Sequence, residues 1–301
     1  MPPPPIPKNS LPAIVKETEA VLEEIARRNI RSGRFNEYLT VLQDAARTLS
    51  TPTNRPWLGS EARDRLFYEA ATQSRQLVDS FDVWKAEPAA LVEAKLRAVC
   101  SGSALPPKAP DSDHSRNTLT ELACAALMRR QGFACRLTDG AADVEATFGN
   151  LKPLVVEAKR PAHIKSLGEN ARRVRKQLKT RLRDGSMYGL GVFASDRMLG
   201  LTDGDLVVAH EEALRGIVHE RVGKLVQKLQ NPKFRLAETA DLGAILTSGA
   251  VFCREPGFLV TISELAFFFT RPEGHPVSDE LFAALRSTVH QEHRIGPFPT
   301  R

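Results

Sequence analysis

Residues 143–147 read DVEAT and residues 154–159 read LVVEAK, and these two runs decide the fold of the chain. An acidic residue opens the first β-like run, and the second run ends in Glu-x-Lys. On a strand, successive side chains point to opposite faces. We therefore expect Glu157 and Lys159 to project together, away from the apolar residues beside them.

A hairpin through residues 148–152 would bring Asp143 close to Glu157 and Lys159. Two carboxylates and one ammonium group at the edge of a sheet suit the binding of a divalent metal ion against a phosphate. Glu145 shares a face with Asp143 and is a further candidate ligand, with a solvated strand position as the alternative. The two runs therefore predict a metal site at this edge.

The tetrapeptide Val-Glu-Ala-Lys occurs twice, at residues 92–95 and again at residues 156–159. The first copy lies in the Ala-rich stretch 87–99, which has helical spacing. On a helix Glu93 and Lys95 point to different sides, and we expect both to face solvent. The tetrapeptide alone therefore carries little weight, and its surroundings decide its role.

The composition is that of an ordinary globular protein. The chain has 301 residues, of which 42% are apolar and 26% charged, enough for one large domain or two smaller ones. No apolar run approaches the roughly 20 residues of a membrane span, so no membrane partner is expected. The scattered cysteines lack paired metal spacing and predict reduced core thiols in a cytoplasmic protein: Cys100, Cys124, Cys135 and Cys253.

The chain divides into a helical part and a part where helices and strands alternate. Apolar residues recur at helical spacing up to about residue 100, and a stretch rich in Gly, Ser and Pro follows. We expect a Pro-rich tail over 1–12, a helical N-terminal region over 13–101, a linker over 102–117 and a second domain over 118–301, with its core at 118–196 and an elaboration at 197–301.

The second domain is predicted to be α/β (α+β). Its core should contain a helix, three strands, a helix and a strand, at residues 118–130, 133–137, 143–147, 154–159, 169–182 and 188–194. Pro161 keeps the third strand from continuing. The last third predicts a helix over 206–229, strands over 243–252 and 258–269, and a closing helix over 279–290.

A dense basic cluster follows the second run. The formal net charge of the chain is +6, and much of its positive charge is gathered here. Ten cations lie between residues 159 and 183 against Glu169 alone: Lys159, Arg160, Lys165, Arg172, Arg173, Arg175, Lys176, Lys179, Arg181 and Arg183. Such a cluster attracts polyanions, whereas the alternative is a solvated helix face.

The order of elements, together with these acidic residues, resembles the PD-(D/E)xK phosphodiesterase superfamily of restriction endonucleases, junction resolvases and repair nucleases. The resemblance covers roughly residues 116–195 and rests on Glu121, Asp143, Glu157-Ala158-Lys159 and Gln177. Ala142 stands in place of the Pro in the name of the motif, which removes no metal ligand. The fold implied is a restriction-endonuclease-like αβββαβ core with a mixed sheet.

The resemblance implies a magnesium or manganese site. Asp143, Glu157 and the Ala158 carbonyl would hold the ion, and Glu121 would hold a second metal or a ligating water. Lys159 would orient the attacking water or stabilise charge in the transition state. Gln177 would donate or accept hydrogen bonds in the same cleft. The helix after this strand would grip the phosphate backbone with Arg160, Arg172, Arg173, Lys176 and Lys179.

Each candidate also has a structural interpretation that the sequence leaves open. Asp143 could cap the turn after Gly140. Glu157 and Lys159 could form a simple ion pair along a strand. Glu121 and Gln177 could lie on helix surfaces.

The resemblance, together with the basic cluster, implies a metal-dependent nuclease that cleaves phosphodiester bonds, with DNA preferred over RNA and endonuclease preferred over exonuclease. By analogy with the superfamily, bacterial defence or restriction is the expected setting. The alternatives are a nucleic-acid-binding or scaffold protein that no longer cuts, a nuclease directed at RNA, or an interaction protein. A homodimer or a protein partner would use the N-terminal helices.

Overall fold

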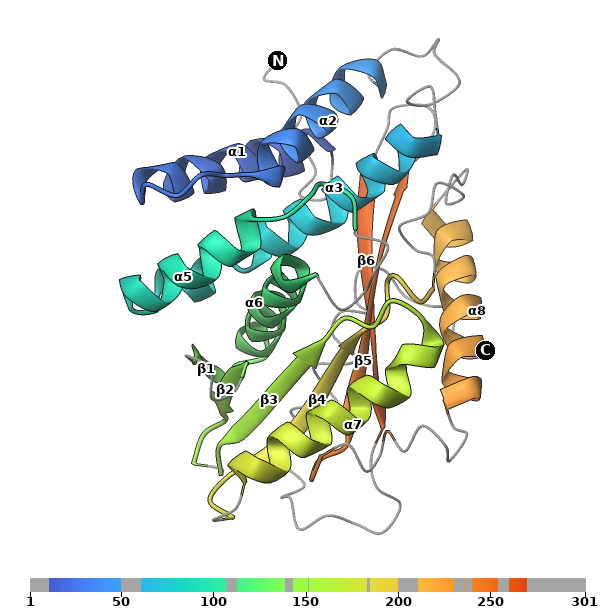
Figure 1. Ribbon diagram of the computed structural model, residues 1–301. Coiled ribbons are helices and arrows are strands. Elements are labelled where there is room, and N and C mark those ends of the chain that lie inside the picture. The colour runs from blue at the N-terminus through green and yellow to red at the C-terminus, as the bar shows by residue number, and fades with distance from the viewer. Residues whose placement is uncertain are drawn as a thin grey trace.

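The computed structural model describes residues 11–49, 61–106, 113–138, 143–150, 152–182, 185–199, 211–229, 236, 240–253 and 260–269. Over these stretches the protein is mixed α/β: a group of helices stacks at one end of a mixed sheet, and further helices lie along the strands (Figure 1). The prediction of an α/β (α+β) fold preceded by helices is confirmed at this level.

The described N-terminal part consists of helices α1 (Leu11–Arg27), α2 (Arg34–Leu49), α3 (Glu61–Asp79), α4 (Phe81–Lys85) and α5 (Ala89–Cys100). The apolar residues whose spacing predicted α1 are the ones it buries: Ile14, Val21, Leu22 and Ile25. Helix α1 packs on α2 and α3, and α3 and α5 both pack on α6 (His114–Arg130). The N-terminal helices therefore contact the α/β part through α6.

The sheet contains β1 (Ala134–Leu137), β2 (Val144–Thr147), β3 (Leu154–Lys159), β4 (Tyr188–Ala194), β5 (Ala244–Cys253) and β6 (Val260–Phe269), in that spatial order. The first three strands are antiparallel, β3, β4 and β5 are parallel, and β6 is antiparallel to β5. The predicted hairpin is confirmed, with Val144 opposite Val156. Asp143 is therefore level with Glu157.

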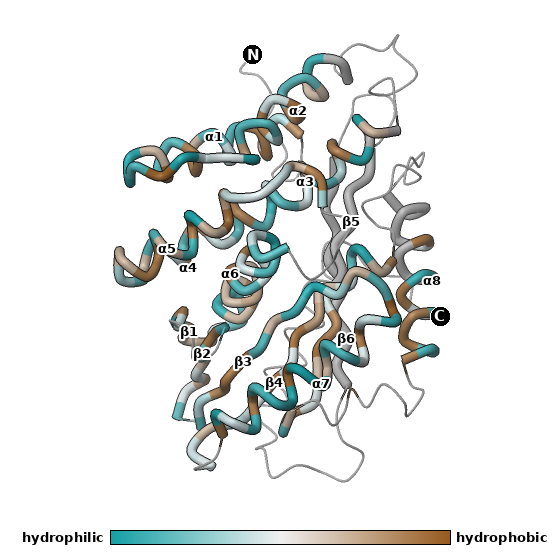
Figure 2. Tube along the Cα trace, in the orientation of Figure 1, coloured by the Kyte–Doolittle hydropathy of each residue, from teal (hydrophilic) through white to brown (hydrophobic). Residues whose placement is uncertain are grey.

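Strand β3 is covered on both faces, since every residue from Leu154 to Ala158 is buried. Helix α6 and helix α7 (Ile164–Arg181) are the helices in contact with this strand. Helix α7 also makes the crossover that the parallel step from β3 to β4 requires. Hydrophilic residues alternate with buried ones along α7 (Figure 2). The buried residues recur at helical spacing: Leu167, Ala171, Val174 and Leu178.

Two helices begin earlier than predicted. Helix α6 starts at His114 rather than Thr118, because Ser115 and Arg116 in its first turn are polar yet buried, which apolar periodicity does not detect. Helix α7 starts at Ile164 rather than Glu169, because His163 and Ser166 form a capping box that begins the helix directly after β3.

The C-terminal part contains α8 (Glu211–Leu229) and the β5–β6 pair, as predicted. The helix predicted over 279–290 and the turn at Gly140 that Asp143 could cap lie outside the described residues. The thiols of Cys100, Cys124 and Cys135 are free and buried, which confirms them as core residues. Among the described helices, none combines the length and the apolar character needed to cross a bilayer.

A buried ionic network joins the N-terminal helices to the ends of two strands. Glu69 of α3 accepts from Arg116 of α6 and lies 3.5 Å from Arg160, the residue after β3. Arg160 also donates to Asp196 after β4, over 3.1 Å. Each of these four side chains is at most 3% exposed. Burial alone would raise the pKa of Glu69, but Arg160 and Arg116 outweigh it and lower that pKa.

Gly33 fixes a second junction, between the start of α2 and the end of α5. Its φ is +53°, in the left-handed region, and a Cβ atom there would collide with the carbonyl oxygen of Cys100. Gly149, in the β2–β3 turn, has a similar φ of +55° but no atom within 4 Å of such a Cβ. The two glycines therefore separate the cost of the backbone conformation from the cost of the close approach.

We predict that Gly33→Ala lowers the free energy of unfolding by about 3 kcal/mol or more, since strain at φ adds to overpacking against backbone. Gly149→Ala should cost about 1 kcal/mol, from φ alone. Urea denaturation followed by circular dichroism measures both. Equal losses in the two variants would contradict the close approach of Gly33 to Cys100.

Candidate active site

The Lys159 ammonium group joins the two carboxylates that the hairpin brings together. Its Nζ atom lies 3.2 Å from Oδ2 of Asp143 and 3.3 Å from Oε2 of Glu157. The same Asp143 oxygen accepts a hydrogen bond of 2.7 Å from the backbone N–H of Ala158. The predicted proximity of Asp143, Glu157 and Lys159 is therefore confirmed, whereas the Ala158 carbonyl as a ligand stays a prediction.

Glu157 is the most buried member of this cluster. Its side chain is fully buried, whereas those of Lys159 and Asp143 are 20% and 15% exposed. Arg181, in the last turn of α7, contacts the other carboxylate oxygen of Glu157. A buried carboxylate is stable only when it is paired, and here two cations compensate it.

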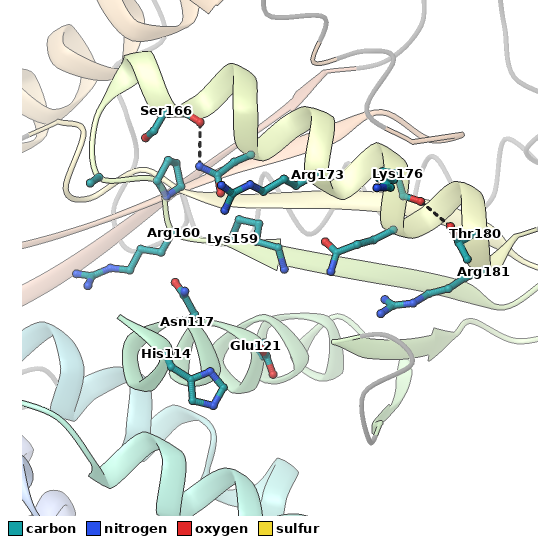
Figure 3. Close-up of a pocket in the computed structure, with 14 residues that line it drawn as sticks. His114, Asn117, Glu121, Lys159, Arg160, Ser166, Arg173, Lys176, Thr180 and Arg181 are labelled. Carbon is teal, nitrogen blue, oxygen red and sulfur yellow. Dashed lines mark hydrogen bonds between the residues drawn. The ribbon is translucent and has the colours of Figure 1, made fainter. Parts of the chain in front are cut away.

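A cleft of about 670 Å³ adjoins this cluster: Lys159 and Arg181 are among the residues that line it, whereas Asp143 and Glu157 are not. Figure 3 shows its two walls: His114, Asn117 and Glu121 come from α6, and Arg173, Lys176 and Arg181 come from α7, with Lys159 between them. The three α6 residues are spaced three and four apart, so they share one face of that helix. The cleft is therefore lined mainly by polar and positively charged groups.

Glu121 faces the cleft from α6, as the resemblance implied, but its carboxylate is already paired. Its Oε2 atom lies 2.8 Å from Nζ of Lys95 on α5, and both side chains are 15% exposed. Burial and the nearby charge of Asp143 raise the pKa of Glu121, while Lys95 and Lys159 oppose that rise. Its role as a second metal ligand stays a prediction.

Gln177 also lines the cleft, from α7. Its Oε1 atom is buried and accepts no hydrogen bond from the described residues. A buried amide oxygen of this kind is costly unless a partner arrives. The side chain predicted to make hydrogen bonds in the cleft is therefore placed to make one.

Of the remaining candidates, Glu145 turns to the neighbouring strand. It accepts a hydrogen bond of 2.7 Å from Arg136 of β1, which satisfies its carboxylate outside the Lys159 cluster. The exposed cations of α7 lie where they were predicted, and two of them line the cleft: Arg173 and Lys176. Arg172 and Lys179 are exposed on the same helix.

Two expectations were wrong. Arg160 was expected to bind nucleic acid; it borders the cleft, but its guanidinium group is buried and already paired with Glu69 and Asp196. Lys95 was expected to face solvent, but its helix packs on α6 and the ammonium group meets Glu121. Both cations form ion pairs with carboxylates on other helices, Lys95 with Glu121 on α6 and Arg160 with Glu69 on α3. Local sequence patterns do not predict such contacts.

The sequence offered partial signals for the residues that it missed. Arg181 follows Gln177 by four residues, so helical spacing alone places the two on one face of α7. Lys95 ends the duplicated tetrapeptide, which drew attention to it without showing its partner. The Glu69–Arg160 contact spans α3 and the end of β3 and left no local signal.

The donor set suits a hard divalent cation in part. Asp143 and Glu157 converge on one point, where Lys159 Nζ now lies, and magnesium is commonly held by one or two carboxylates with waters completing its shell. Over the described part of the chain, no three His, Cys, Asp or Glu side chains form a cluster of metal-binding geometry. An ion at this point would therefore have two carboxylates and solvent as its ligands.

Comparison of the chain with models of protein families, with curated proteins and with solved structures finds no match.

We predict that Arg160→Met lowers the free energy of unfolding by about 3–5 kcal/mol, because Glu69 and Asp196 would keep buried charges with one partner fewer. Arg172→Met, on the exposed face of α7, should change it by less than about 0.5 kcal/mol. Urea denaturation of both variants tests whether Arg160 is buried in the network and Arg172 is exposed. Similar stability of the Arg160→Met variant and the wild type would contradict the buried network.

Proposed function

We propose that this protein is a metal-dependent nuclease that hydrolyses phosphodiester bonds, with DNA as the substrate, acting as an endonuclease in bacterial defence or restriction. The observation that carries the proposal is the convergence of Asp143 and Glu157 on the Lys159 ammonium group. A carboxylate pair and a lysine at one point are the parts that metal-assisted hydrolysis of a phosphodiester needs.

The order of elements supports a restriction-endonuclease-like core. Helix α6 is followed by the antiparallel strands β1, β2 and β3, then by α7, and then by β4 parallel to β3. This is the αβββαβ order with a mixed sheet that the resemblance implies. The acidic residues lie at the expected points along it, on β3 and just before β2.

In this proposal Asp143 and Glu157 hold Mg²⁺ or Mn²⁺, with waters filling the shell. When bound, the ion supplies a Lewis acid for the phosphate and an acidified water for attack. Asp143 is held in place by the Ala158 N–H, and Glu157 by burial, so little reorganisation is needed to present both oxygens. Arg181 stays beside Glu157 and balances the charge of its second oxygen.

Lys159 is the group that moves. With a cation between the two carboxylates, its ammonium group must leave their midpoint and turn toward the cleft that it lines. There it would orient the attacking water or stabilise negative charge on the phosphate oxygens in the transition state. Arg173 and Lys176 on the α7 wall would hold the backbone phosphates, which gives affinity without sequence recognition.

A second candidate is a polyanion-binding protein on the same fold that does not cleave. The observation in its favour is that Lys159 and Arg181 already compensate both carboxylates. Such a protein would need the cations of α7 but no metal ion. Cleavage assays separate the two candidates.

We predict that the purified protein cleaves DNA with Mg²⁺ or Mn²⁺ and not with chelator, and that Asp143→Asn, Glu157→Gln and Lys159→Ala each lower the rate by about 100-fold or more. Plasmid, linear duplex, single-stranded DNA and RNA serve as substrates. Cleavage of closed circular plasmid identifies an endonuclease, and the RNA sample identifies an RNA-directed enzyme.

The matched control is Glu93→Gln, which makes the same change in the identical Glu-Ala-Lys tripeptide on α5. It should leave the rate unchanged, because Glu93 pairs at the surface with Arg97. Equal cleavage by the wild type and all three site variants would refute the proposed site. Binding without cleavage in every metal condition would favour the non-cleaving candidate.

A further inference from the structure

The lysines of the two tetrapeptide copies both pair with acidic candidate residues of the proposed site. Lys159, from the second copy, joins Asp143 and Glu157, and Lys95, from the first, lies 2.8 Å from Glu121. The two lysines come from different parts of the fold, β3 and α5. The helix that carries the first copy is therefore part of the surroundings of the cleft.

Lys95 of α5 forms an ion pair with Glu121 of α6. Glu121 is among the residues that line the cleft, and its carboxylate pairs with Lys95, which is not among them. The side chain of Lys95 is only 15% exposed, unlike that of Arg97, which is 56% exposed on the same helix. A largely buried ion pair of this kind holds its partner in one position more firmly than a surface pair does.

The pairing divides the acidic residues of the cleft into two groups. Asp143 and Glu157 share Lys159, while Glu121 has a cation of its own on the α5 side. Glu121 and Lys159 line the same cleft, and the charge of Asp143 acts on Glu121, so in the absence of Lys95 the carboxylate of Glu121 would have Lys159 as the cation it shares with Asp143. A cation entering between them would then be drawn to three carboxylates rather than two.

On the basis of the nuclease site proposed above, we propose that Lys95 is a positioning residue that keeps Glu121 out of the ligand set formed by Asp143 and Glu157. The N-terminal helices thereby limit how tightly the site holds its metal ion. Magnesium that keeps several waters can exchange one of them for a phosphate oxygen, whereas an added carboxylate would occupy that position.

The test is Mn²⁺ binding without substrate, measured from the loss of the free Mn²⁺ signal in electron paramagnetic resonance at pH 8, well above the usual pKa of glutamate of about 4.3. Lys95→Met should bind Mn²⁺ at least about tenfold more tightly than the wild type, because one more carboxylate becomes free to bind. Lys95→Arg should restore the wild-type affinity, and Arg97→Met, on the exposed side of α5, should match the wild type.

A double variant separates positioning from simple charge. If Lys95 acts through Glu121, then Lys95→Met combined with Glu121→Gln loses the gain in affinity. If the gain persists in the double variant, or if Lys95→Met binds no more tightly than the wild type, the proposal is wrong. Glu121→Gln breaks the pair from the other side without removing Lys95, and loss of Mn²⁺ binding in that variant would show that Glu121 is a ligand and overturn the proposal.

The Asp143→Asn variant tests the metal site of the proposed nuclease separately from the role of Lys95. It should abolish Mn²⁺ binding in the wild-type background. Undiminished binding in Asp143→Asn would refute the proposed metal site itself, whereas binding lost there and unchanged in Lys95→Met would refute only the role of Lys95. Thermal unfolding of each variant confirms that it is folded.

Discussion

The contact between Arg160 and Glu69 is the constraint on which the rest of the structure depends. Arg160 follows Lys159 directly, so the end of β3 is held to helix α3 of the N-terminal part and, through Asp196, to the end of β4. Removing one charge from such a buried set leaves others uncompensated, which is far more costly than losing a surface pair. The backbone at Lys159 is therefore held by contacts to α3 and to the end of β4, while its side chain remains able to turn.

The same constraint explains why the N-terminal helices belong to the site. One hydrophobic core continues from α1 through α6 into the sheet, and the buried ions lie within it. Lys95 and Glu69 reach the α/β part from two different N-terminal helices, α5 and α3. A cleft between α6 and α7 thus depends on residues more than fifty positions before the strand that carries Glu157 and Lys159.

The sequence predicted the parts of the fold that local patterns encode. The period of the strands put Glu157 and Lys159 on one face, and the hairpin brought Asp143 to them, so the centre of the candidate site was predictable. The burial of Arg160 and the partner of Lys95 were not, because both depend on how distant helices pack. A basic residue in a basic cluster looks exposed until the elements around it are placed.

A crystal structure of the protein grown with Mn²⁺, with anomalous scattering recorded at the manganese edge, would show whether Asp143 and Glu157 bind a metal ion. We expect an anomalous peak between their carboxylates, with the Lys159 ammonium group displaced toward the cleft. A map with no peak there, and with Lys159 still bridging the two carboxylates at saturating Mn²⁺, would contradict the proposed metal site.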